Sequence, residues 1–192
     1  MMEEYIYQIL KNRILGWDSE LVEEIYVLSF YIDFENDDYR KPRLIFGYNT
    51  TSNHHNNISM ASSELEARWN YAFWLQNEEI VIGNISLKDT REEEVMRENW
   101  VLESLWYYTD KEAEENFDRI LELGEKIKDD FYKIIKNVVR RLHANGVIVS
   151  QFNKEIPLII HELEYYSLIA DINKEINPNE SINDFCNWIE SM

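Results

Sequence analysis

The sequence predicts an α+β fold, with a mainly antiparallel sheet of about five strands flanked by helices and one long helix in the second half. Apolar, β-rich segments come in hairpin-like pairs rather than in regular alternation with helices, which is typical of an antiparallel sheet. The clearest helical periodicity runs through residues 110–144. Only five Gly and three Pro punctuate the 192 residues, and no repeat or linker is apparent. We therefore expect long elements in a single domain over residues 1–192.

The first quarter of the chain predicts a helix followed by a strand pair. Residues 3–15 carry apolar side chains on one helical face. Residues 24–34 are apolar and rich in aromatic and β-branched types, which favours a central strand. A polar turn at residues 35–38 and Pro42 then lead into a second strand, residues 43–49. These two strands are expected to pair antiparallel.

The next segment is mixed. Residues 50–57 are polar and are expected to form a loop. Ser63 has capping-box spacing, so a short helix is expected to begin near Glu64. An aromatic cluster follows at residues 69–74, and residues 79–84 predict a third strand.

Two further capping boxes begin at Thr90 and Thr109, and each predicts the start of a helix. The first of these helices would bury Val95, Trp100 (or Asn99), Leu102 and Leu105. The second begins the long helix 110–144, in which Gly124 is a candidate bend and Asn145-Gly146 a left-handed stop. Its expected inward face consists of Ala113, Phe117, Ile120, Ile127, Phe131, Ile134, Val138 and Leu142.

The C-terminal quarter predicts two short strands, residues 147–151 and 156–161. Residues 165–176 then predict a helix that ends at Asn177-Pro178. A last helix is expected to open at Ser181, with its inward face formed by Ile182, Phe185 and Ile189.

Charge is the most informative feature of the composition. Acidic side chains outnumber basic ones by 37 to 19, giving a net charge of −18 at pH 7. Residues 1–96 carry −10 and residues 97–192 carry −8, so the charge is spread over the whole body. Such a field repels nucleic acid and anionic lipid and attracts basic proteins. The sequence predicts a basic protein partner, no nucleic acid and no membrane. The simpler alternative is that the acidic surface only keeps the protein soluble.

Residue usage favours a cytoplasmic protein. The single cysteine, Cys186, excludes an intrachain disulfide, and we expect it to be a structural thiol on the last helix. The opening residues do not resemble a signal peptide, and no run of 18 apolar residues occurs.

The chain offers little for catalysis or metal binding. His54 and His55 are adjacent, so they do not point at one metal, and no third ligand lies nearby. The segment that begins His161-Glu162 resembles the start of a zinc-protease helix, but the second histidine is missing. No phosphate loop or dinucleotide fingerprint occurs. The sequence therefore predicts no metal site, no cofactor and no catalytic residues.

The aromatic cluster is the one local oddity. If residues 68–74 formed a strand, Trp74 would face opposite to Trp69, and at least one ring would approach the surface. Ordinary core is one interpretation of these rings. The other makes Trp69 and Trp74 partner-binding anchors, with an acidic rim formed by Glu92, Glu93 and Glu94.

Several segments resemble a bacterial family known only as domain of unknown function 4303. The similar segments are residues 24–33, Tyr48-Asn49-Thr50, the RW-x-x-A-x-W pattern at Arg68–Trp74, and residues 156–165, closing on Asn177-Pro178. Small acidic bacterial proteins of this kind are often encoded beside toxins, so the resemblance loosely implies an immunity role. The family has no agreed catalytic residues, so none is carried over.

The first functional hypothesis is a non-enzymatic, acidic protein-binding domain, in one form an immunity protein that neutralises a basic toxin. An acidic surface steers toward a basic nuclease and can occupy the place of nucleic-acid phosphates. One alternative is an enzyme with a carboxylate-centred site. Another is a scaffold or self-associating domain that uses residues 110–144 as its contact. The sequence does not predict the oligomeric state or the strand order.

Overall fold

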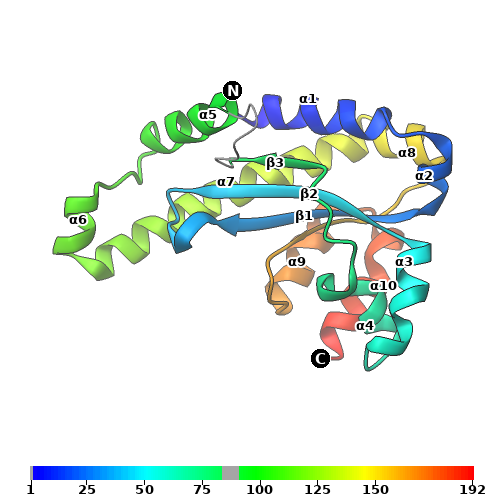
Figure 1. Cartoon of the computed structure of the whole chain (residues 1–192). Coiled ribbons are helices and arrows are strands. Elements are labelled where there is room, and N and C mark those ends of the chain that lie inside the picture. Colours follow the sequence, from blue (N-terminus) through cyan, green and yellow to red (C-terminus); the bar gives the residue numbers. More distant parts are fainter. Residues whose placement is uncertain (1, 84–90) are drawn as a thin grey trace.

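A four-stranded mixed sheet forms the centre of the computed structural model, which describes residues 2–83 and 91–192 (Figure 1). The strand order is β3-β2-β1-β4. The α+β class is confirmed, but the sheet has four strands rather than about five and is not wholly antiparallel. The strands are β1 (Ile25–Phe34), β2 (Pro42–Thr50), β3 (Ile80–Ile82) and β4 (Leu158–His161).

The hairpin of β1 and β2 is confirmed. The two strands pair antiparallel along their length, with Phe30 opposite Phe46. The connection between them contains a short 3-10 turn, Glu35–Asp37, in which Asn36 and Asp37 both have φ of 57°. Short polar residues tolerate this left-handed conformation better than branched ones, which explains their place here.

The prediction of a strand at residues 147–151 is wrong, because this segment is the helix α8 (Val147–Phe152). Gly146, with φ of +69°, ends the preceding helix and begins the new one. A short apolar run is compatible with a buried helix as well as with a strand, so its periodicity alone did not decide between the two. The chain then returns to the sheet as β4, which pairs parallel to β1 with Tyr31 opposite His161.

Two asparagines close the free edge of β4. The side chain of Asn177 accepts a hydrogen bond from the Leu158 nitrogen at 2.8 Å and donates to the Leu158 carbonyl at 2.9 Å. Asn173, on α9 (Ser167–Ile176), does the same for Ile160, at 2.8 and 2.7 Å. Each amide thus supplies the donor and acceptor of a missing neighbouring strand, which satisfies an edge that would otherwise be open.

One face of the sheet is covered by α1 (Met2–Leu15), α7 (Phe117–Ala144) and α8 (Figure 1). Their buried side chains form the larger core cluster with β1, β2 and β4. The N-terminal helix predicted at residues 3–15 is confirmed within one residue at its start. The short helix α2 (Ser19–Glu24), capped by Asp18, leads directly into β1.

The opposite face is covered by α4 (Glu64–Trp69), α9 and α10 (Asn179–Glu190). Ile182, Phe185 and Ile189 face inward on α10 as predicted. Ser63 caps α4 as predicted. Residues 51–57, expected as a loop, form the helix α3 (Thr51–Asn57) because the Thr50 side chain caps it. No helix among the described residues is long and apolar enough to cross a membrane.

The predicted long helix is divided at Asn116. Its first turns form α6 (Asp110–Glu115), capped by Thr109 in the predicted capping box, and Asn116 then caps α7. The helix α5 (Arg91–Leu102) precedes them, and its expected cap Thr90 lies outside the described residues. Four predicted core residues are exposed instead: Val95, Leu102, Leu105 and Phe117. They lie on α5, on the connection between α5 and α6, and at the start of α7, where the fold leaves them exposed.

Gly124 does not interrupt α7, which runs as one helix of 28 residues. A Cβ atom at this position would overlap the ring of Tyr39, from the connection between β1 and β2. The glycine therefore lets the hairpin end pack against the helix.

We expect Gly124→Ala to destabilise the protein by about 1–3 kcal/mol, because the added carbon displaces the Tyr39 ring. At an ordinary position inside a helix, the same change stabilises by about 0.5–1 kcal/mol. Urea unfolding measures the difference. In a Tyr39→Ala background, Gly124→Ala is expected to become neutral or stabilising; equal destabilisation in both backgrounds would show that Tyr39 is not the cause.

Candidate functional site

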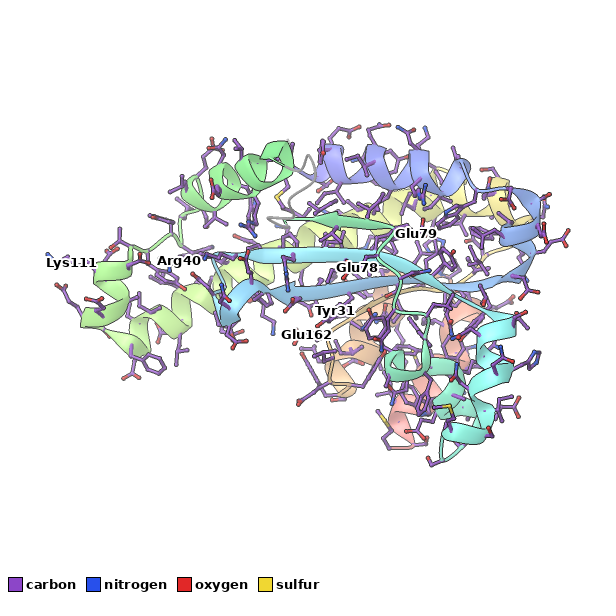
Figure 2. The ribbon with its side chains drawn as sticks, in the orientation of Figure 1. Tyr31, Arg40, Glu78, Glu79, Lys111 and Glu162 are labelled. Atoms are coloured by element: carbon purple, nitrogen blue, oxygen red, sulfur yellow. The ribbon has the colours of Figure 1, made fainter. Side chains whose placement is uncertain are left out.

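An open groove of about 450 Å³ lies where the parallel strands β1 and β4 end. Its walls come from the end of β1, the turn after it, the first half of α7 and the residues that follow β4. Tyr31 and Glu162, both labelled in Figure 2, are two of its lining residues. β1 and β4 run parallel, with Tyr31 in register with His161. The residues that follow Tyr31 and those that follow His161 therefore reach the same edge of the sheet. We call this feature the tyrosine groove.

Carboxylates dominate the tyrosine groove. Its charged lining consists of Asp33, Asp37, Glu162 and Glu164 together with the ammonium of Lys128. Two of these acids are already engaged: Asp33 forms an ion pair with Arg43, and Glu162 lies 2.9 Å from the Lys128 ammonium. Asp37 and Glu164 are exposed and form no ion pair with the described residues. The groove therefore presents two free negative charges to a second molecule.

Aromatic rings form the remaining surface of the groove. Tyr31, Tyr39 and Tyr166 line it together with Phe34. Phe34 and Tyr39 pack edge to face with centroids 5.1 Å apart. The Lys128 ammonium lies 5.9 Å from the Phe34 centroid, so a ring of this groove already faces a cation. Aromatic faces beside carboxylates are the combination that recognises ammonium and guanidinium groups.

The tyrosine hydroxyls stay protonated. Burial raises the pKa of Tyr31 to about 12, and the nearby charge of Asp33 adds to the effect. Burial also raises the pKa of Tyr132, whose hydroxyl donates to Glu162 at 2.6 Å. Glu162 is thus held between Tyr132 and Lys128.

A buried Ser–His pair supports the groove from behind. The Nδ1 atom of His161 lies 2.9 Å from the Glu162 carbonyl, which fixes it as the donor, so the Ser29 hydroxyl donates to Nε2 at 2.8 Å. The imidazole stacks between the rings of Tyr31 and Tyr165. A nucleophile needs access to substrate, whereas His161 and Ser29 are both buried. The pair therefore positions Tyr31 rather than forming a reactive centre.

The predicted anchors Trp69 and Trp74 do not lie on the surface. Their exposed fractions are 2% and 5%, and both belong to the core cluster on the α9–α10 face. Residues 68–74 do not form the strand that was considered for them, because residue 69 ends α4 and Tyr71–Phe73 form a 3-10 turn, and both indoles are buried. The core interpretation of the aromatic cluster is confirmed, and the assignment of partner contact to these two rings is corrected.

The predicted acidic rim, Glu92, Glu93 and Glu94, falls in the first turn of α5. The side chains of these three residues lie outside the part of the structure that is described. Their contribution to an interface stays a prediction.

Histidine and cysteine play structural parts. Within the described ranges 2–83 and 91–192, no three His, Cys, Asp or Glu side chains are placed to hold a metal ion. His54 is buried, and its ring contacts Tyr26 at 6.1 Å between centroids. Cys186 is buried on α10, and burial raises its thiol pKa, as expected for a structural thiol.

The sequence missed the groove because its parts are far apart in the chain. Asp33 and Asp37 lie at the end of β1 and just after it, whereas Glu162 and Glu164 follow β4 in the last quarter of the chain. The signal that was available is that each strand is followed at once by acidic and tyrosine side chains. Without the parallel pairing, nothing indicated that these two ends meet.

No family model, curated protein or solved structure matches this chain. The resemblance to domain of unknown function 4303 therefore stays a prediction, and the functional argument depends on the geometry.

His161 is expected to make stability depend on pH. Burial lowers its pKa to about 4, against about 6.5 in the unfolded chain. The unfolded state therefore binds a proton that the folded state excludes, so this contribution is complete above pH 6.5 and is lost as the pH falls through about 4. The loss between pH 7 and pH 4 is about 3 kcal/mol.

Urea unfolding at several pH values tests this expectation. The double variant Ser29→Ala/His161→Leu removes both partners of the Ser29–His161 hydrogen bond, leaves only the Glu162 carbonyl without its donor, and should lack that part of the pH dependence. If wild type and variant lose stability in parallel, another group is responsible.

Proposed function

We propose that this chain is a binding protein that takes a basic segment of a protein partner into the tyrosine groove. The observation that carries the proposal is the convergence of four carboxylates and three tyrosine rings on one open groove, with Asp37 and Glu164 free of ion pairs within the described chain. A lysine or arginine side chain of the partner would lie against the tyrosine rings, and its charged group would lie between Asp37 and Glu164. Cation–π contacts at exposed sites contribute about 0.5–1 kcal/mol each.

Charge over the whole chain supports the same partner class. A net charge of −18 attracts basic proteins over distances of the order of the Debye length, about 8 Å at physiological salt. This attraction raises association rates more than it raises affinity. Specificity therefore depends on the groove and on the apolar side chains beside it.

The groove also offers apolar anchors that the sequence did not identify. Leu121 and Leu163 line it with exposed fractions of 44% and 68%. Phe117, one turn before Leu121 on α7, is 69% exposed. Large apolar side chains surrounded by charge are typical of contact surfaces. In this proposal they replace Trp69 and Trp74 as the residues that a partner covers.

Binding a basic toxin, as an immunity protein does, is the biological role that such a groove would serve. A nuclease toxin presents cationic side chains where nucleic-acid phosphates bind, and an acidic groove can occupy them. The support for this role is the charge and shape of the groove together with the predicted family resemblance.

An arginine-rich peptide is a direct probe of the groove. We expect Asp37→Asn/Glu164→Gln to weaken binding of an octa-arginine peptide roughly three- to tenfold at low salt, because two exposed pairs are lost. Isothermal titration calorimetry measures the change.

The matched control is Glu20→Gln/Glu23→Gln, which removes the same charge from the exposed surface of α2. This control is expected to bind almost as wild type does. If both double variants weaken binding equally, the peptide senses only net charge and the groove is not its site.

The natural partner is tested by pull-down of the purified products of the genes that flank this one. We expect capture of a basic protein to be lost in Leu163→Asp and retained in Trp74→Phe, because the first residue is exposed and the second is core. Retained capture by Leu163→Asp would exclude the proposed surface.

A further inference from the structure

The exposed side of α7 carries a charge pattern that reverses along its length. Asp118, Glu122, Glu125 and Asp129 are followed, at the same three- and four-residue spacing, by Lys133, Lys136 and Arg140. At 100° per residue all seven lie within an arc of about 80°, over a length of about 33 Å. We call this row of seven residues the α7 stripe. Its first half is entirely acidic and its second half entirely basic.

Three cations on the first half of α7 lie outside the stripe. Arg119 lines a small pocket with Glu112 and Glu115 of α6. The Lys126 ammonium lies 4.4 Å from the centroid of the Trp106 ring, in the connection between α5 and α6. Lys128 forms its ion pair with Glu162, beyond β4. None of these three cations forms an ion pair with an acid of the stripe within the described chain.

The charges at the centre of the stripe are not fully engaged in ion pairs within the described chain. Lys136 and Arg140 both pair with Glu175 of α9, which leaves one of these two positive charges in excess. Asp129 and Lys133 are exposed, and neither has an ion-pair partner in the described part of the chain. Charges without a partner on a rigid helix are available to a second molecule.

A second copy of this chain is the complement of this pattern. When the α7 helices of two copies are placed antiparallel about a two-fold axis between residues 129 and 133, Asp129 of each copy faces Lys133 of the other. In the same register Glu122 faces Arg140, and each such pair occurs twice. A parallel arrangement would instead place like charges together.

A groove of about 680 Å³ runs beside the stripe between α7 and α9, and it supplies the apolar contact. Leu168, 54% exposed, lines it between Tyr166 and Glu175. Because the two-fold axis keeps this flank on the same side in both copies, the Leu168 side chains of both copies lie on the same side of the interface. We propose that the chain forms an antiparallel, two-fold symmetric dimer through the α7 stripe, with Leu168 on its apolar flank.

Sedimentation equilibrium of the full chain at low salt tests the proposal with charge reversals at the axis. We expect wild type to dimerise, and Asp129→Lys and Lys133→Glu each to raise the dimer dissociation constant about tenfold or more, because each gathers four like charges. The swapped variant Asp129→Lys/Lys133→Glu has the net charge of wild type and restores both pairs. Its dissociation constant is expected to return to within about threefold of wild type.

An equimolar mixture of the two single variants, Asp129→Lys and Lys133→Glu, is expected to form a heterodimer. Across the axis, the lysine introduced in one chain faces the glutamate introduced in the other, and the native Lys133 of the first chain faces the native Asp129 of the second. Glu23→Lys and Lys154→Glu, at exposed positions on other parts of the chain, are the controls for net charge and should dimerise as wild type does.

Three results would overturn the proposal. Wild type that remains monomeric at about 0.5 mM excludes a specific dimer of useful affinity. Failure of the swapped variant to recover excludes this register. Equal weakening by the controls shows a general charge effect. None of these substitutions touches Asp37 or Glu164, so the result is independent of the partner-binding test.

Discussion

The structure depends on the parallel pairing of β1 with β4 and on the closure of β4 by two asparagine side chains. An edge strand buried under helices would leave the amides and carbonyls of Leu158 and Ile160 unsatisfied. Asn177 and Asn173 replace the missing strand at 2.7–2.9 Å. This closure fixes α9 against the sheet and places the residues that follow β4 beside the end of β1.

Burial of aromatic side chains on the α9–α10 face follows from the same arrangement. His161 continues β4, and its neutral ring is enclosed by the rings of Tyr31, Tyr71 and Tyr165. Trp74 packs on this histidine as well, with centroids 5.6 Å apart. The indole side chains of this face therefore stabilise the core.

Local signals in the sequence predicted the elements well where one physical preference dominated. The strand Ile25–Phe34 is a long β-rich apolar run, and the Thr109 capping box opens a helix as expected. Residues 147–152 were mispredicted because a short apolar run fits a helix or a strand equally. The polar segment 51–57 became helical through the cap at Thr50, which outweighed its weak intrinsic propensity.

By itself, the sequence determined the α+β class, the antiparallel hairpin of β1 and β2, the acidic field and the long amphipathic helix, because these depend on composition and on neighbours within a few turns. Tertiary structure alone decided which side chains meet. Parallel pairing brings Asp33 and Glu162 to one groove from opposite ends of the sequence, and packing turns Trp69 and Trp74 inward. Long-range pairing of strands is set by the burial of whole faces, and no local pattern encodes it.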